Sequence, residues 1–222
     1  MKAKDQEQVK LFERALRAVY NRARAEDIIA GMAWYEHGHA ICASLARAYG
    51  VTLAQSCAVM SVLSPRQRWY VNVIDASNTL RAWSLHHARA HTNQFRHQMD
   101  KAIDILVNGT GLDLEALMPL ISASKTSGHK TRAFARNLYN PHDNQAVTID
   151  THMATMLGIT NITPRLYKLA SIAIRNCAAR QDLLPCQYQA ITWLVWRHEH
   201  RSEAFLRDNH WPIAPPWLSR KG

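Results

Sequence analysis

Apolar residues recur at three- or four-residue spacing along most of the chain, which is the period of a helix with one buried face. In the N-terminal segment, for example, Val9, Phe12, Leu16, Val19 and Tyr20 share one face. The pattern predicts helices over residues 5–24, 28–49, 53–63, 70–85, 93–107, 114–122, 129–138, 151–157, 164–179 and 185–207.

Clear breaks separate these segments. Ser64-Pro65, residues 108–111 (Asn-Gly-Thr-Gly) and Asn140-Pro141 are typical of turns. Residues 146–149 form a β-prone run, but the run is short and isolated. No pairs of alternating segments and no repeat period accompany it, so we expect an all-α fold.

Composition bounds the size of the core and the sign of the surface charge. The chain has 222 residues, of which 47% are hydrophobic, so it can bury one good core or two small ones. Lysine and arginine number 27 against 17 acidic residues, a formal net charge of +10. Such a field attracts polyanions, although a basic protein without a specific partner would have the same balance.

The sequence gives no sign of a membrane segment or a secretory signal. Residues 1–10 are charged and polar, and no window reaches eighteen apolar residues. We therefore expect a cytoplasmic protein that does not contact a membrane.

Cysteine and histidine spacing does not indicate a metal site. The cysteines are Cys42, Cys57, Cys177 and Cys186, too far apart to form a compact cluster, so reduced core thiols are expected. Residues 198–200 read His-Glu-His, and adjacent residues point to different faces of a helix. We expect no metal ion and no cofactor.

The most informative segment runs from Gly128 to Gly158. Gly128 frees the backbone for close approach to a phosphate, and Thr131 with its neighbouring amides can donate to an anion at a helix N-terminus. Lys130 brings an amine to the same position. Asp150 follows an apolar run and precedes another helical pattern, so its carboxylate can act beside a bound phosphate.

These residues resemble the helix-hairpin-helix DNA glycosylases of the endonuclease III type. The resemblance rests on residues 128–131 (Gly-His-Lys-Thr), Asn137 and residues 147–152 (Val-Thr-Ile-Asp-Thr-His). Upstream, residues 63–72 resemble the family's segment that fills the gap left by a flipped base, and residues 101–106 follow in the family's order. The resemblance covers residues 50 to 160.

Two features depart from the family pattern. Thr126 replaces the first glycine of the hairpin and the preceding Leu-Pro is absent, so the tight turn is expected to be altered. Many relatives carry a C-terminal iron-sulfur cluster, which this chain cannot form because only Cys177 and Cys186 lie in that region.

The resemblance implies a particular organisation. Residues 51–145 would form a central helical bundle carrying the gap-filling loop and the hairpin. Residues 1–50 and 146–222 would form a second lobe, carrying the aspartate, with a DNA-binding cleft between the two. The implied partner is double-stranded DNA containing a modified base, bound by a monomer.

The resemblance also implies a role for each motif residue. Arg66, Gln67 or Arg68 would occupy the hole left by the extruded base. The hairpin residues would anchor the DNA backbone; they are Lys125, Gly128, His129 and Thr131.

Asp150 would stabilise the positive charge that develops on the deoxyribose, or would activate the attacking water. The same residue can simply cap a helix, and the two roles are compatible. Lys130 stands where lyase-competent relatives carry a Schiff-base lysine. Whether it attacks the sugar or only contacts phosphate is left open, so glycosylase activity is better supported than lyase activity.

The base pocket is predicted from aromatic residues alone. Trp34, Tyr35 and His39 offer rings and polar groups in one helical stretch, and Trp69 lies beside the proposed gap-filling loop. Such rings also serve as core. Residues 193–197 (Trp-Leu-Val-Trp-Arg) are interpreted as the apolar face of a packing helix.

Residues 31–35 and 62–69 look more like small phage-associated members of the superfamily than like housekeeping repair enzymes. This similarity implies a 5-substituted pyrimidine as the base, removed in repair or in defence against modified phage DNA. Two alternatives remain. One is a transferase of the same fold that remodels a hypermodified thymine without excising it, and the other is a non-catalytic DNA-binding module.

Overall fold

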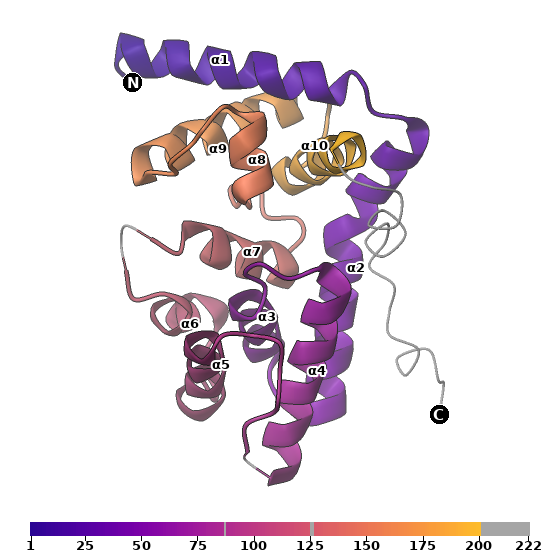
Figure 1. Ribbon diagram of the computed structural model, residues 1–222, viewed down its shortest axis with the longest axis vertical. Helices are drawn as coiled ribbons and strands as arrows, with labels where there is room; N and C mark the ends of the chain where they lie inside the picture. The colour runs from indigo at the N-terminus through magenta and orange to yellow at the C-terminus, as the bar shows by residue number, and fades with distance from the viewer. Residues whose placement is uncertain (87, 125–126, 201–222) are drawn as a thin grey trace.

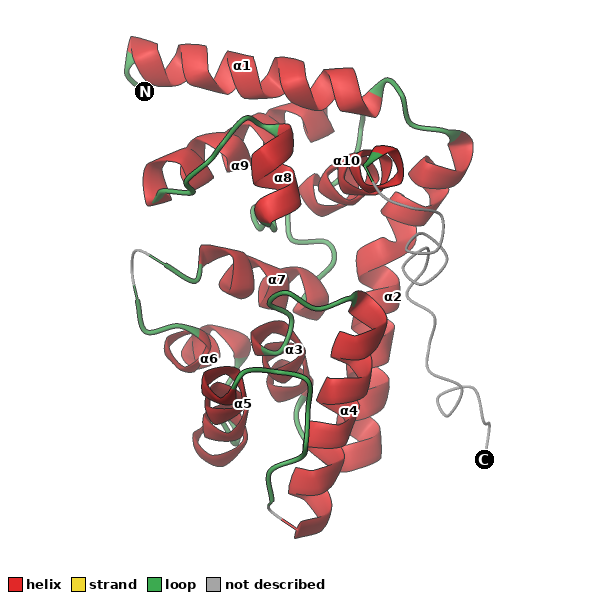
Figure 2. Cartoon of the chain, in the orientation of Figure 1, coloured by secondary structure: helices red, strands yellow, loops and turns green. Residues whose placement is uncertain are grey.

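The protein is built from helices joined by short loops. The computed structural model describes residues 1–86, 88–124 and 127–200, and within these ranges there is no strand (Figures 1 and 2). The helices are α1 (Ala3–Tyr20), α2 (Ala25–Tyr49), α3 (Leu53–Val62), α4 (Trp69–His86), α5 (Arg96–Asn108), α6 (Leu114–Ile121), α7 (His129–Tyr139), α8 (Thr151–Met156), α9 (Pro164–Ala179) and α10 (Pro185–Glu199). The predicted all-α fold is confirmed.

The helix bounds follow the sequence pattern closely. Most ends agree with the predicted ones to within a few residues, because capping residues mark them. Thr52 caps α3 by accepting from the amide of Gln55 at 3.1 Å, and Thr163 caps α9 by accepting from the amide of Leu166 at 3.2 Å. The last helix was predicted to run to residue 207, and the part beyond residue 200 lies outside the described residues.

The β-prone run at residues 146–149 is extended but pairs with no strand in the described chain. The hydroxyl of Tyr167 binds two of its backbone groups instead. The Tyr167 hydroxyl donates to the carbonyl of Val147 at 2.7 Å and accepts from the amide of Ile149 at 3.2 Å. This pairing lets a short buried segment end at Asp150 without a neighbouring strand.

Two clusters of buried apolar side chains hold the helices together. The first joins α2 to α7 and the start of α10, and the second joins α1, α8, α9 and the rest of α10 with residues 147–159. Figure 1 shows α1, α8, α9 and α10 at one end of the molecule and α3 to α6 at the other, with α2 running between the ends. The predicted division of the chain into two lobes stays a prediction.

Helices α2 and α10 cross at unusually short range. A Cβ added at Gly31 of α2 would lie 2.7 Å from the backbone nitrogen of Ile191 on α10. Only glycine permits this approach, because any side chain at Gly31 would meet the backbone of α10. The two helices therefore pack closely against each other at this point.

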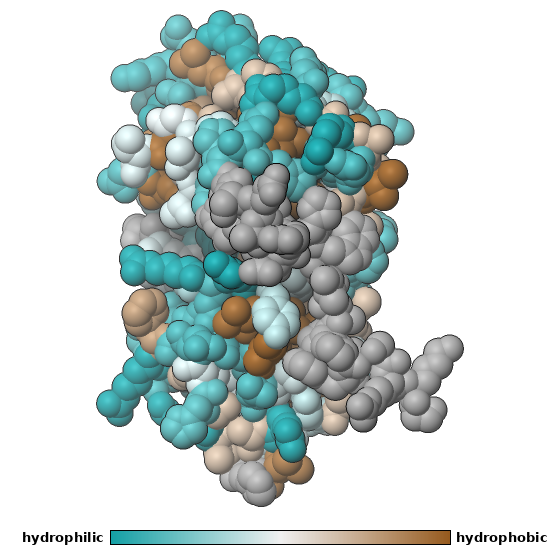
Figure 3. All heavy atoms as spheres, turned by 45° about the vertical axis from the view of Figure 1, so that its right-hand side comes forward, coloured by the Kyte–Doolittle hydropathy of each residue, from teal (hydrophilic) through white to brown (hydrophobic). Residues whose placement is uncertain are grey.

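The surface of the described residues is mainly polar. On the side drawn in Figure 3, hydrophilic residues predominate and the hydrophobic ones are scattered. None of the described helices is both long enough and apolar enough to span a bilayer. All four cysteines are buried, and none is in a disulfide.

Candidate functional site

A cleft of about 720 Å³ lies where the two apolar clusters meet. Its lining comes from α2, from residues 64–72, from residues 127–134, from residues 148–152 and from α10, with Ile162 and Tyr167 completing it. Cavities of this size hold small-molecule ligands.

Most of the residues predicted for the site line this one cleft. They are Trp34, Tyr35, Arg66, Gln67, Arg68, Trp69, Gly128, His129, Lys130, Thr131 and Asp150. His39 is not among the lining residues, because its Nδ1 donates to the carbonyl of Leu138 at 2.9 Å and so ties α2 to the end of α7. Lys125 lies outside the described residues.

Two features of the turn before α7 require glycine at position 128. Gly128 is the residue before the helix and has φ of +75°, the left-handed region that favours glycine. A Cβ there would also lie 2.2 Å from the Ser122 hydroxyl oxygen. No side chain of Gly128 caps α7, and the first residues of the helix line the cleft, where an anion would meet the positive end of the helix.

Arg132 holds the same turn from inside the helix. Its guanidinium donates to the carbonyls of Ser122 at 2.9 Å, Ser124 at 2.8 Å and Ser127 at 3.1 Å. These bonds join residues that precede and follow positions 125–126 to the first turn of α7. Arg132 was not singled out in the sequence, because a basic residue in the first turn of a helix has many possible roles.

Lys130 is bound to the loop before α4. Its ammonium donates to the Ser64 hydroxyl at 2.7 Å, and that hydroxyl donates onward to the carbonyl of Ser61 at 2.8 Å. The ammonium also lies 5.1 Å from the centre of the Phe134 ring. Desolvation lowers the pKa of Lys130, while the carboxylate of Asp150 acts in the opposite direction. The two charged groups are therefore within electrostatic reach of each other.

The loop of residues 63–68 is held rigidly. The Gln94 side chain donates from Nε2 to the carbonyls of Leu63 at 2.7 Å and Pro65 at 3.0 Å. Arg66 has φ of +59°, which is uncommon for a residue with a side chain. Arg66 and Arg68 are both exposed along the mouth of the cleft.

Gln67 is bound to the interior of the protein. Its Nε2 donates to the carboxylate of the buried Asp75 at 2.7 Å, and that carboxylate also accepts from the amide of Asn93 at 3.1 Å. This contact anchors the loop, so Gln67 would have to leave Asp75 before it could fill the gap left by a base.

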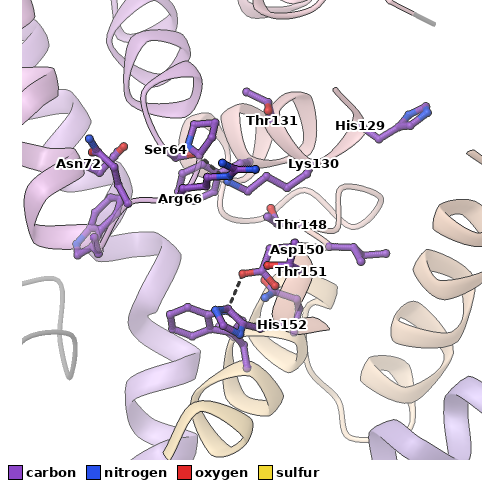
Figure 4. Close-up of a pocket in the computed structure, with 18 of the residues that line it drawn as sticks. Ser64, Arg66, Asn72, His129, Lys130, Thr131, Thr148, Asp150, Thr151 and His152 are labelled. Atoms are coloured by element: carbon purple, nitrogen blue, oxygen red, sulfur yellow. Dashed lines mark hydrogen bonds between the residues drawn. The ribbon is translucent and has the colours of Figure 1, made fainter. Parts of the chain in front are cut away.

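Asp150 is held at both carboxylate oxygens. Oδ1 accepts from the amide of Met153 at 2.9 Å and so caps α8, and Oδ2 accepts from the indole N–H of Trp193 at 2.9 Å (Figure 4). Each oxygen keeps a second lone pair. The predicted capping contact is therefore present, and a second donor on α10 fixes the plane of the carboxylate as well.

Figure 4 shows Lys130, Ser64 and Asp150 around one opening, with the His129 ring directed away from it. That ring packs against Tyr167 with centroids 5.3 Å apart. Desolvation and the neighbouring Arg132 lower the pKa of His129, which favours its neutral imidazole.

An aromatic wall forms one side of the cleft; it consists of Trp34, Tyr35, Trp69, Phe134 and Trp193. Trp34 is its centre, with ring centroids 5.0 Å from Trp69, 6.1 Å from Phe134 and 6.4 Å from Trp193. The loop of residues 64–68 and the turn of residues 127–131 also line the cleft and form what we call the basic rim. A planar ring has stacking partners on the wall, and an anion has donors on the rim.

Residues 193–197 pack against the core as the sequence predicts, but Trp193 has a second role that the sequence did not indicate. Its ring lines the cleft, its N–H binds Asp150, and the Arg197 guanidinium lies 4.2 Å from its centroid. Trp193 and Asp150 are 43 positions apart, so no local pattern could have connected them.

Comparison with known proteins gives one match. A family model described as "Family of unknown function (DUF7178)" matches residues 1–200. The matched range spans the helices from α1 to α10 and every residue that lines the cleft. No curated protein and no solved structure matches the chain.

Proposed function

The chain belongs to the DUF7178 family of unknown function, and we propose from its cleft that it is a DNA glycosylase. It would flip a modified base, a 5-substituted pyrimidine, out of DNA and hydrolyse the bond between base and sugar. The observation that carries the proposal is the joint position of Asp150 and Lys130 in one cleft whose lining includes the aromatic wall and the basic rim.

Asp150 is suited to the chemical step. As the bond from C1′ to the base nitrogen breaks, the electron pair leaves with the base and positive charge develops on the sugar. A fixed carboxylate stabilises this charge without first having to reorganise. Water then forms the new bond to C1′, and its proton passes to a carboxylate oxygen that still has a free lone pair. The product is a free base and an abasic site.

The basic rim is suited to the DNA backbone. The open amides of α7, the exposed Arg66 and Arg68, and a net charge of +10 all favour phosphate binding. We assign α6, α7 and the turn between them to the helix-hairpin-helix motif, with Arg132 as the group that holds the turn. We likewise assign the two apolar clusters to the two lobes and the cleft to the DNA-binding groove.

Lys130 is suited to a lyase step on the same sugar. Attack of its neutral amine on C1′ with loss of the base forms an imine, and β-elimination then breaks the 3′ phosphate bond. Because the pKa of Lys130 is lowered, the neutral amine is available at lower pH than for an exposed lysine. Borohydride trapping of the imine should therefore rise with pH and level off below the usual range of lysine. Base release without any trapped adduct would make Lys130 a phosphate contact only.

A panel of DNA substrates tests the function. The protein is incubated with unmodified duplexes and with duplexes that carry different 5-substituted pyrimidines, and free base, abasic sites and strand breaks are scored. The proposal expects abasic sites on at least one modified substrate. A base that is altered but still attached would favour the transferase, and tight binding with no product on any substrate would favour the non-catalytic module.

A further inference from the structure

Two buried hydrogen-bonded pairs of polar side chains lie beside the cleft, and one of them contains Gln189. The Tyr35 hydroxyl donates to Oε1 of Gln189 at 2.9 Å, and each residue is only 4% exposed. In the second pair, Asn137 donates from Nδ2 to the hydroxyl of Thr148 at 3.0 Å. Buried polar groups in such pairs are held in one arrangement, because a lost partner costs the full desolvation penalty.

The direction of the bond from Tyr35 fixes the orientation of the Gln189 amide. Burial raises the pKa of Tyr35, so its hydroxyl keeps its proton. The phenolic proton is donated to Gln189, and the nearby Thr148 and Asn137 act to lower the pKa of Tyr35. Oε1 of Gln189 therefore faces Tyr35, and its amide nitrogen is left on the other side.

The cleft is the environment of that amide nitrogen. Gln189 is one of the lining residues, and Nε2 has no hydrogen-bond partner within residues 1–86, 88–124 and 127–200. Trp193 lies one helical turn further along α10, lines the same cleft and donates to Asp150. An oriented N–H donor is thus one turn from the indole that holds the proposed reacting carboxylate.

We propose that Gln189 is the specificity-determining residue of this cleft. It reads the extruded pyrimidine by donating from Nε2 to a carbonyl oxygen at C4, and so selects 4-oxo pyrimidines of the uracil type over 4-amino pyrimidines of the cytosine type. This inference rests on the proposed function and names its substrate class. An amino group in the same position would set two donors against each other in a buried site, and sites of this kind reject the wrong partner strongly.

Binding by an inactive variant provides the test. In the Asp150→Asn background, affinity is measured by fluorescence anisotropy for two duplexes that differ only at C4, one with 5-hydroxymethyluracil and one with 5-hydroxymethylcytosine. Each modified base is placed opposite a tetrahydrofuran abasic analogue, so that base-pair strength does not enter the comparison. We expect the duplex with 5-hydroxymethyluracil to bind at least about 10-fold more tightly than the duplex with 5-hydroxymethylcytosine.

Two substitutions then identify the residue responsible. Adding Gln189→Glu replaces the donor with an acceptor and should invert the preference. Adding Tyr35→Phe frees the amide to rotate and should bring the affinity ratio close to one. Gln187→Glu is the matched control, because Gln187 is on α10 but does not line the cleft. It should leave the ratio unchanged.

The outcomes separate this inference from the proposed function. Equal affinity for the two duplexes, no binding above that of an unmodified duplex, or a ratio that Gln189→Glu leaves unchanged would each overturn the role of Gln189. If the ratio behaves as expected but the wild-type protein releases no base from any substrate, the glycosylase proposal fails while base reading by Gln189 stands.

Discussion

The two sides of the cleft are built in different ways. The basic rim consists of two short segments whose basic residues stand together in sequence motifs, and hydrogen bonds hold these segments in place. Arg132 binds the carbonyls of Ser122 and Ser127, Gln67 binds Asp75, and Lys130 joins the two segments through Ser64. The aromatic wall belongs to no such motif, and it and Asp150 depend on contacts such as Tyr35 with Gln189, 154 positions apart. The groups that would hold an anion can therefore be recognised in the sequence, whereas the groups proposed for the reaction come together only in the folded chain.

Removing the charge of Asp150 should have the largest effect on base release while leaving DNA binding by the basic rim intact. Asp150→Asn keeps the shape of the side chain but removes the charge that stabilises the sugar, so the single-turnover rate of base release should fall by roughly 10²–10³-fold. Duplex affinity should change little, because the basic rim is intact. Asp182→Asn is the matched control, since Asp182 is exposed, lies outside the cleft and has a φ of +53° that asparagine tolerates.

The hydrogen bond that Trp193 donates to Asp150 is the next largest expected effect. Trp193→Phe removes the N–H and keeps an aromatic ring, so base release should slow by about 10-fold or more, in line with a bond to a charged group. Trp196→Phe changes the same residue type outside the cleft and should have little effect on the rate. A Trp193→Phe protein as active as the wild type would show that Trp193 contributes packing alone and that its bond to Asp150 does not support the reaction.

Loss of the Arg132 guanidinium should affect the basic rim, and with it the affinity for DNA. Arg132→Lys keeps the charge but cannot bond to three carbonyls in a fixed plane, so duplex affinity at low salt should weaken by about 5- to 10-fold. The rate at saturating DNA should stay close to that of the wild type. Arg136→Lys, on the exposed part of the same helix, provides the control. A lower rate with unchanged affinity would contradict the division between the two sides.

Glycine substitutions measure how tightly the rim itself is packed. Gly128→Ala should destabilise the protein both through its φ of +75° and through the clash with Ser122. Gly111 has a φ of +78° with nothing within 4 Å of an added Cβ, so Gly111→Ala reports the backbone effect alone, about 1 kcal/mol. Urea unfolding should give a loss for Gly128→Ala about 1 kcal/mol larger than for Gly111→Ala. Equal losses would mean that the turn relaxes around the new side chain.

The fold could be predicted from sequence to a large extent, because helix periodicity and capping residues are local signals. The predicted end at residue 49 and the predicted starts at residues 53 and 164 are those of α2, α3 and α9 in the structure. The residues of the basic rim were also predicted, because glycine, lysine and arginine stand together in short motifs.

The remainder of the site could not be predicted, for physical reasons. A tryptophan on an apolar helix gives the same signal whether it fills the core or binds a carboxylate, so Trp193 was interpreted as packing. Gln189 belongs to no motif, and its orientation depends on a phenol that only the folded chain brings near. His39 had the same local signal as Trp34 and Tyr35, but its side chain binds a backbone carbonyl outside the cleft.

The most direct test of the central claim counts products in a single turnover. Wild-type protein in excess over a duplex with one 5-substituted uracil should release one free base for each abasic site formed, with mass spectrometry identifying the base. The Asp150→Asn protein should bind the same duplex and release almost none. A duplex that is fully bound by the wild-type protein, with its base still attached after long incubation, would contradict the proposed glycosylase function.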